Sequence, residues 1–376
     1  MADRWTDKDL LSDEVRGFLK NANHVVVNVE GPLMDTTPAA SETGVTQLLH
    51  CMKKEVAPFL TDIGADIWSL CNNHIMDAGP AGLKSTLNIA EFYGAQTIGV
   101  GMDVTGARKP VIINEAGGIG MICVGYQRAC RAASEGVPGC FRWDDLDAIG
   151  AVIKDIKSKC RWCVVVAHAG EEFTPLPSPY TRNRYIEYLD LGADIVVSHH
   201  PHVPMNYETI GDKTIFYSLG NFIFDTNYQR SQHYTDVGIL LNLKFTENSY
   251  SFDAMGLKIV RGEERIVEGP LPDIFEDVQE SEYELLSPLS VKSFIEATKR
   301  QLAFLYPEEY TNPSEEKLME NFMQPLRSGR VPGEVLDFPI LLPIAAKAEE
   351  GAWKSSKHKK IIDYIMKQME PVQENT

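Results

Sequence analysis

The sequence lacks both a basic stretch that could follow a nucleic-acid backbone and an apolar run that could cross a membrane. Its 376 residues contain 36 Lys and Arg against 53 Asp and Glu, which gives a formal net charge of -17. Because nucleic-acid binding depends on basic contacts to phosphates, we expect no nucleic-acid partner. No apolar run approaches the roughly 20 residues of a membrane-spanning helix, and no basic and apolar secretory signal is visible at the start. These absences predict a cytoplasmic protein without an intrinsic membrane span.

The sequence also lacks the paired cysteines of a disulfide scaffold. It has seven cysteines, an odd number, and all of them lie at or before Cys163, which excludes the framework of a small secreted domain. Cys160 and Cys163 form a Cys-x-x-Cys pair, but no second pair completes a zinc site. We interpret these two residues as buried thiols, the common state of free cysteine, in a protein of a reducing compartment.

What the sequence does contain is a set of four apolar runs that end in polar, metal-binding side chains. In open α/β sheets, ligands collect beyond the carboxyl ends of the strands. Imidazole, amide and carboxylate groups together suit Zn, Fe or Mn better than a metal that prefers thiolates. The sequence therefore predicts an α/β protein with a shared metal or substrate site at these strand ends. They are Glu30 after Val25–Val29, Asn72-Asn73-His74 after Ile67–Leu70, His168 after Trp162–Ala167, and His200-Pro201-His202 after Asp194–Ser198.

Each of these positions has a simpler interpretation when it is taken alone. Glu30 could equally be a cap or an ion-pair partner, and Asn72-Asn73 favours a turn because Asn tolerates a positive φ. His168 by itself favours a hydrogen-bonded core histidine. The His200-Pro201-His202 segment favours ligation, because proline fixes the backbone between two imidazoles. Only the combination of four such strand ends favours a shared site.

Further polar residues follow the same strands. His74 and Asp77 are three residues apart, so a helical turn would let the carboxylate orient the imidazole, which makes His74 a candidate general acid. The alternative is an ordinary acidic residue near a helix N-terminus. Glu171 and Glu172 are either a solvated acidic edge or groups that face substrate or metal. Asn221 ends another strand, where a turn is the default interpretation.

The periodicity changes near Pro270. Up to that point helices and strands alternate, and residues 237–269 alternate in the manner of antiparallel strands. Beyond it, segments 276–286, 291–304 and 315–322 are amphipathic and helical in pattern. We expect an α/β domain over residues 1–270 and a mainly helical C-terminal region over residues 271–376.

With these residues in view, the chain resembles the capsule-synthesis CapA family, also called poly-γ-glutamate biosynthesis proteins, over about residues 13–245. That family is similar to the calcineurin-like metallophosphoesterases, so the resemblance implies a four-layer α/β/β/α sandwich with a two-metal site and, here, a helical C-terminal appendage. The motifs that carry it are Asn28-Val29-Glu30, Asn72-Asn73-His74 with Asp77 and Gly79, His168-x-Gly170-x-Glu172, His199-His200-Pro201-His202-Val203, and Phe216 to Asp225.

The resemblance also implies roles. Glu30 stands where a bridging carboxylate sits, and His74 with Asp77 stands where the catalytic acid or transition-state stabiliser sits. The remaining positions are Asn73, His168 and His200 for one metal, His202 for the other, and Asn28, Glu172 and Asn221 for substrate binding.

One family motif is missing from the sequence. Family members normally open with a strand ending in Gly-Asp, which supplies a ligand to the second metal, whereas no Gly-Asp precedes Glu30 here and Gly211-Asp212 lies in a predicted turn. Either the start is truncated or the motif has been lost. We expect one divalent ion (Mn, Fe or Zn) rather than two, and an exposed sheet edge beside Val25–Val29.

The implied function is capsule or poly-γ-glutamate biosynthesis with a metal-dependent hydrolase or transferase site. The expected partners are an anionic polymer or a phosphate-containing small substrate, and other capsule-synthesis proteins. Two alternatives stay open: a non-catalytic binding or scaffold subunit with a degenerate metal site, and a soluble metal-dependent phosphoesterase unrelated to capsule. Members of the family are often associated with the membrane or cell surface.

Overall fold

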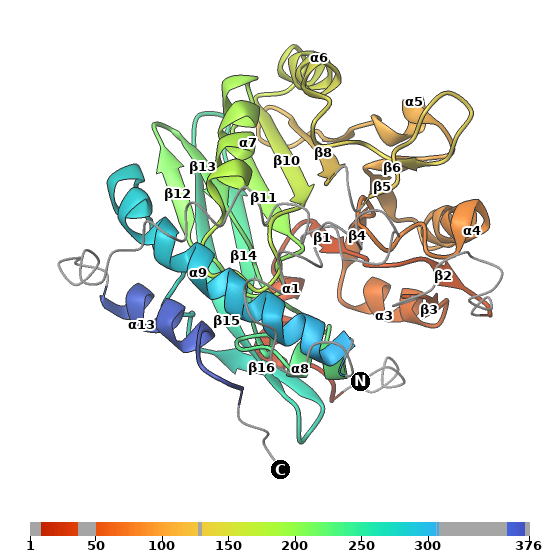
Figure 1. Ribbon diagram of the computed structural model, residues 1–376. Helices are drawn as coiled ribbons and strands as arrows, with labels where there is room; N and C mark the ends of the chain where they lie inside the picture. Colours follow the sequence, from red (N-terminus) through yellow and green to blue (C-terminus); the bar gives the residue numbers. More distant parts are fainter. Residues whose placement is uncertain (1–8, 37–49, 127–129, 306, 308–358, 373–376) are drawn as a thin grey trace.

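The computed structural model describes residues 9–36, 50–126, 130–305, 307 and 359–372. Within these ranges, helices alternate with parallel strands, and an antiparallel sheet follows (Figure 1). The predicted α/β class is therefore confirmed. No helix in these ranges combines the length and apolar character needed to span a bilayer.

The central sheet has six strands in the order β12-β13-β11-β10-β8-β7. Its middle strands β8, β10, β11 and β13 are parallel, and β7 and β12 are antiparallel edge strands. Every residue of β8 and β10 is buried, as expected for a parallel sheet with both faces covered. Helices α6 and α7 pack against β10 and β11 (Figure 1). The bounds are β7 (Val111–Ile113), β8 (Ile119–Gly125), α6 (Leu146–Lys157), β10 (Trp162–His168), α7 (Pro179–Asp190), β11 (Ile195–His199), β12 (Tyr207–Ile210) and β13 (Lys213–Phe216).

A second, three-stranded parallel sheet has the order β1-β4-β5. Among the described strands β1 pairs only with β4, and Val26 of β1 is 37% exposed, so β1 forms an edge, as the sequence predicted. The elements of this part are α1 (Asp13–Lys20), β1 (Val25–Asn28), β2 (Leu33–Met34), β3 (Met52–Lys53), α3 (Val56–Asp62), β4 (Ala65–Ser69), α4 (Gly79–Phe92), β5 (Gln96–Ile98), β6 (Val100–Gly101), α5 (Val104–Ala107) and β9 (Gly139–Cys140).

The third sheet is the antiparallel meander β14 (Val237–Phe245), β15 (Tyr250–Val260) and β16 (Arg265–Gly269), which the alternating pattern predicted. One apolar cluster joins all three sheets. It includes Ile67 of β4, Val166 of β10 and Leu257 of β15. This shared core fixes the ends of β1 and β4 relative to those of β10 and β11. A short helix, α8 (Asn227–Arg230), precedes β14.

Two described helices lie beyond residue 270, α9 (Glu280–Leu305) and α13 (Lys359–Gln368), and they pack beside each other (Figure 1). Residues 280–286 and 291–304 of the predicted segments lie in one continuous helix, α9, which contains Pro288, whereas residues 276–279 of the first segment precede the helix. Segment 315–322 lies outside the described residues. Helix α9 is bonded to the α/β part, because Tyr283 donates to the Pro177 carbonyl (2.9 Å) and Ser290 accepts from the Leu176 amide (3.0 Å). The domain boundary near residue 270 stays a prediction.

Candidate functional site

The ends of β1, β4 and β10 meet at one edge of the shared core (Figure 1). Glu30 follows β1, Asn73 follows β4, and His168 is the last residue of β10. The Asn73 Oδ1 lies 2.9 Å from His168 Nε2. The Glu30 Oε1 lies 3.9 Å from His168 Nε2 and 3.7 Å from His202 Nε2. The structure thus brings together four side chains that are up to 172 positions apart in the sequence.

A strained loop after β11 places two more imidazoles at this edge. His200 and His202 have φ angles of 101° and 61°, which are uncommon for residues other than glycine and are found where the surrounding structure enforces them. Both side chains are buried. The His200 ring lies 4.9 Å from that of His168 and 6.2 Å from that of His202, between centroids. The His-Pro-His segment therefore turns both imidazoles inward.

Asn221 fixes the orientation of His202. Its amide nitrogen donates to Gln229 Oε1 (3.1 Å) and to the Thr235 carbonyl (3.0 Å), so its carbonyl oxygen faces His202 Nδ1 at 3.0 Å. Nδ1 of His202 then carries the proton and Nε2 presents its lone pair toward Glu30. Metal-binding histidines are typically oriented by this kind of carbonyl acceptor.

Glu30 is held ionised inside the cluster. Burial raises its pKa, but the positive charges that His202, His168 and His74 carry when protonated outweigh this and hold the pKa of Glu30 well below its usual range. Its Oε2 accepts from Asn28 Nδ2 at 3.3 Å. Its Oε1 is buried and has no hydrogen-bond donor among the described residues, which leaves a charged oxygen directed at two imidazole nitrogens.

His74 and Asp77 form the contact that their spacing predicts. A turn precedes α4, and His74 Nδ1 lies 2.8 Å from Asp77 Oδ2. Burial lowers the pKa of His74, but the hydrogen bond to Asp77 and the charge of Glu30 together raise it by more than burial lowers it. The net shift of the pKa is therefore upward. Asn72 anchors this turn, because its amide donates to the Val29 carbonyl (2.8 Å) and accepts from the His74 amide (3.2 Å). His74 is therefore held as a proton donor.

His50 also belongs to the cluster and was missed by the sequence reasoning. Its ring stacks on that of His74 with centroids 3.9 Å apart, and its backbone N–H donates to Asp77 Oδ2 at 3.0 Å. No motif surrounds His50 in the sequence. It reaches the site because β3, which follows it, pairs with β2.

We expect His50 to make the folded protein sensitive to acid. Burial lowers its pKa to about 4, and the neighbouring His74 acts in the same direction, against Glu30 and Asp77. Between about pH 6.5 and 4 the unfolded chain binds a proton that the folded chain does not, so stability falls as the pH is lowered. The free energy of unfolding, measured with a chelator present, should decrease for both proteins when the pH is lowered from 7 to 4.5. The decrease should be about 2 kcal/mol smaller for His50→Gln than for wild type. Equal losses in urea titrations of the two proteins would contradict this.

The two acidic residues after β10 are buried, at 3% and 8% exposure for Glu171 and Glu172. A solvated acidic edge, one of the two alternatives, is therefore wrong. Glu172 accepts from Tyr228 (2.9 Å) and from Gln301 of α9 (2.6 Å), and so links this loop to the C-terminal helix. Its role in substrate binding stays a prediction, as do those of Asn28 and Asn221.

The donor atoms of the cluster have the spacing of metal ligands only in pairs. Two donors bound to one ion at about 2.0–2.2 Å can be at most about 4.4 Å apart. The pairs that Glu30 Oε1 makes with His168 Nε2 and His202 Nε2, at 3.9 and 3.7 Å, fall within that span. However, no group of three or more His, Cys, Asp or Glu side chains in the described ranges is arranged to hold a metal ion as it stands. The chemistry and the pairwise spacing fit, while full coordination would need side-chain adjustment.

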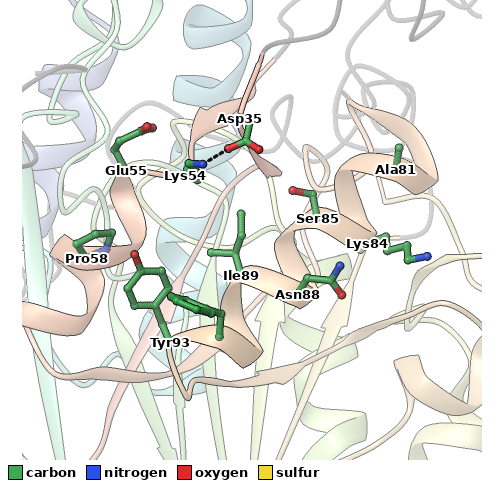
Figure 2. Close-up of a pocket in the computed structure, with 11 residues that line it drawn as sticks. Asp35, Lys54, Glu55, Pro58, Ala81, Lys84, Ser85, Asn88, Ile89 and Tyr93 are labelled. Carbon is green, nitrogen blue, oxygen red and sulfur yellow. Dashed lines mark ion pairs between the residues drawn. The ribbon is translucent and has the colours of Figure 1, made fainter.

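A groove of about 670 Å³ lies away from this cluster, between α3 and α4 (Figure 2). An ion pair of 2.5 Å between Lys54 and Asp35 crosses one end of it, and Ile89 and Tyr93 contribute apolar surface. None of the predicted site residues lines it.

These observations define an α/β protein with a histidine- and carboxylate-lined site at the ends of its parallel strands. The family model described as "Bacterial capsule synthesis protein PGA_cap" matches residues 4–226, more than half of the chain. The protein belongs to this family, as the motifs predicted.

Two curated relatives are named as capsule or PGA biosynthesis proteins. The chain is 28% identical over 230 residues to "Capsule biosynthesis protein CapA" of Bacillus anthracis, which covers 60% of this chain and 56% of that protein. It is 28% identical over 228 residues to "PGA biosynthesis protein CapA" of Bacillus subtilis (strain 168), and this match covers 60% of this chain and 59% of that protein. It thus spans a little under three fifths of the length of these relatives. A crystal structure of the protein TT1561 of Thermus thermophilus aligns with a TM-score of 0.35 and 9% identity over 68% of this chain and 91% of that one, too weakly to assign a fold.

Proposed function

We propose that this protein acts in the synthesis of a bacterial capsule polymer of the poly-γ-glutamate type, through a metal-dependent hydrolase or transferase site. The observation that carries the proposal is the position of Glu30 Oε1. It is buried, charged and without a hydrogen-bond donor among the described residues, and two imidazole nitrogens lie within 3.9 Å. The relatives' names and the family match support the polymer.

One divalent ion, Mn, Fe or Zn, would be held by Glu30, Asn73, His168 and His200, and His202 would stand at the position of the other ion. When bound, such an ion polarises a phosphoryl or carbonyl oxygen and lowers the pKa of a bound water. The substrate would be an anionic polymer or a phosphate-containing small molecule, cleaved at a phosphate or amide-type bond. The positions of the strand ends also support the finer fold proposal, a metallophosphoesterase-like four-layer sandwich.

His74 would supply the proton that the leaving oxygen needs. The Asp77 carboxylate accepts from Nδ1, which leaves the proton on Nε2 available to the substrate. The raised pKa of His74 favours the protonated imidazole. When Nε2 gives up its proton, the imidazole stays bonded to Asp77 through Nδ1, so its position does not change. Asn28 and Asn221 are the candidate neutral contacts to the substrate.

We expect His74→Ala to lower hydrolysis of a generic phosphodiester, such as bis(p-nitrophenyl) phosphate, by about 100-fold. Bound metal, measured by elemental mass spectrometry after loading with Mn, Fe or Zn, should be unchanged because His74 is a proton donor and not a ligand. His24→Gln is the matched control, because His24 makes a similar 2.6 Å contact with Asp66 away from the site. An unaltered rate in His74→Ala would refute the assigned role.

The alternative of a non-catalytic binding subunit is favoured by the lack of a ready three-donor group in the described ranges. In that case binding of poly-γ-glutamate should survive chelation, and no preparation should hydrolyse the diester. Turnover of a small phosphate ester without any polymer binding would instead support a phosphoesterase unrelated to capsule.

A further inference from the structure

Four buried cysteines gather directly behind the site. Cys71 follows β4, Cys123 lies in β8, Cys140 ends β9, and Cys130 precedes the loop that leads to β9. The Cys71 thiol neighbours those of Cys123, Cys130 and Cys140, and the Cys130 thiol neighbours that of Cys140. All four side chains are at most 3% exposed. Their spacing follows no cysteine motif, so only the fold brings them together.

Two glycines make room for this cluster. A Cβ at Gly125 would lie 2.6 Å from Cys130 Sγ and 2.8 Å from Cys71 Sγ. A Cβ at Gly99 would lie 2.5 Å from Cys71 Cβ and 2.7 Å from Cys123 Cβ. Any larger side chain would push the thiols apart. The sulfurs of Cys71 and Cys130 are therefore within reach of each other because the strand beside them carries no side chain at residue 125.

Cys130 and Cys140 occupy the two ends of one exposed loop. The Cys140 backbone N–H donates to the Arg131 carbonyl (2.8 Å), and its carbonyl accepts from the Ala133 amide (2.9 Å). Residues 131–138 between them are half-buried or exposed. The two thiols are therefore buried at the base of a loop that is itself open to solvent. Hydrogen bonds from Cys130 and Cys71 also lower the pKa of Cys140, which favours the reactive thiolate.

We propose that Cys130 and Cys140 form a reversible disulfide when the protein meets a peroxide. The Cys140 thiolate attacks one oxygen of hydrogen peroxide, the O–O bond breaks, and a sulfenic acid and water form. The Cys130 sulfur then attacks the Cys140 sulfur, the S–O bond breaks, and a second water leaves. Two thiols lose two electrons and two protons, and one peroxide is reduced to two waters. A dithiol reductant reverses the step.

Oxidation of Cys140 would alter the contacts of Asn72, which lies beside the site. In its protonated form the Cys140 thiol donates to the Asn72 carbonyl at 3.7 Å, and a disulfide abolishes that form. The Asn72 side chain in turn holds the Val29 carbonyl and the His74 amide. The cluster is thus placed to couple the oxidation state of two cysteines to the segment that carries Asn73 and His74.

Peptide mapping tests the disulfide directly on the full-length protein. Trypsin cleavage after Arg128, Arg131 and Arg142 places Cys130 and Cys140 in separate peptides, and Cys71 and Cys123 fall in two others. After treatment with a few equivalents of hydrogen peroxide and alkylation under denaturing conditions, we expect loss of two alkylatable thiols and a Cys130–Cys140 linked peptide. Dithiothreitol should abolish the linked peptide. Hydrogen exchange of residues 71–77 should increase in the oxidised protein.

Cys163→Ser is the matched control, because Cys163 is also buried but belongs to a different apolar cluster; it should oxidise like wild type. Cys130→Ser should lose the linked peptide, with folding checked by circular dichroism. Because the linked peptide is sought in wild type, the result does not depend on that variant folding. Any of three results would overturn the proposal. They are retention of all thiols after peroxide treatment, a disulfide to Cys71 instead, and stoichiometric zinc in wild type that is absent from Cys130→Ser.

Discussion

Replacing Glu30 by glutamine is expected to abolish metal retention and to lower diester hydrolysis by on the order of 100-fold to 1,000-fold. The substitution keeps the size and shape of the side chain but removes the charge that is directed at His168 and His202. A neutral amide binds hard and borderline cations less well than a carboxylate does. Glu30 places a carboxylate oxygen within 4 Å of both imidazoles. We therefore expect its substitution to reduce metal retention and hydrolysis more than the substitution of any single neutral ligand does.

Two measurements separate this effect from general damage. Metal content should fall to that of the chelated protein, and metal should raise the melting temperature of wild type but not of Glu30→Gln, because only a bound ligand stabilises the folded state. Glu91→Gln, on the exposed face of α4, is the matched control and should behave like wild type. Full metal content in Glu30→Gln would place the ion elsewhere and refute the proposed centre.

The strand ends of the site could be predicted from the sequence because each follows a buried apolar run. β1, β4, β10 and β11 all end within one or two residues of the predicted position. Parallel strands in one sheet present their carboxyl ends at the same edge, so the residues after β1 and β4 are close in space, and so are those after β10 and β11. These two pairs belong to different sheets, and only the packing of the sheets on the shared core brings them together. The His74–Asp77 contact was predictable for a similar local reason, since it needs only one turn of backbone.

The contacts that the sequence did not reveal depend on pairing between distant segments. His50 stacks on His74 because β3 pairs with β2, and no local pattern encodes that pairing. For Asn221 a turn is the default interpretation and the resemblance implies a substrate contact, and neither indicates that its carbonyl fixes the tautomer of His202. The thiol cluster is of the same kind, because its members come from segments as far apart as residues 71 and 140.

Helix α9 shows the opposite case, in which packing overrides a local signal. Pro288 removes a backbone donor and costs about 3 kcal/mol in a helix interior. The helix nevertheless continues, because Leu286 and Leu289 on either side are buried in a cluster with Leu176 and Ile361. Burial of such side chains contributes about 1.5–3 kcal/mol each, enough to offset the local cost. A sequence pattern cannot show this without the partner surface.

A buried ion pair fastens α7 to the edge of the central sheet. Arg182 donates from Nε and Nη2 to the two carboxylate oxygens of Glu208, at 2.9 and 2.6 Å. The side chains are only 9% and 2% exposed. Tyr217 donates a third hydrogen bond to Glu208 (2.7 Å), and the Tyr283 ring of α9 packs on the Arg182 guanidinium at 4.8 Å. The pair therefore holds together a helix, a strand and the C-terminal helix.

Glu208→Gln should lower the free energy of unfolding by about 3–5 kcal/mol, because it removes the buried partner of Arg182 and leaves only the exposed Glu280 carboxylate, 3.8 Å away, as a counter-ion. Asp155→Asn is the control: it breaks the exposed Lys159 pair of α6 and should cost only about 0.3–0.5 kcal/mol. Urea unfolding followed by circular dichroism measures both. If Glu208→Gln were as mild as the control, water would have to reach Arg182 in the folded state, and the pair would no longer explain how α9 is held against α7. A large loss would instead make this ion pair a main link between the α/β part and the C-terminal helix.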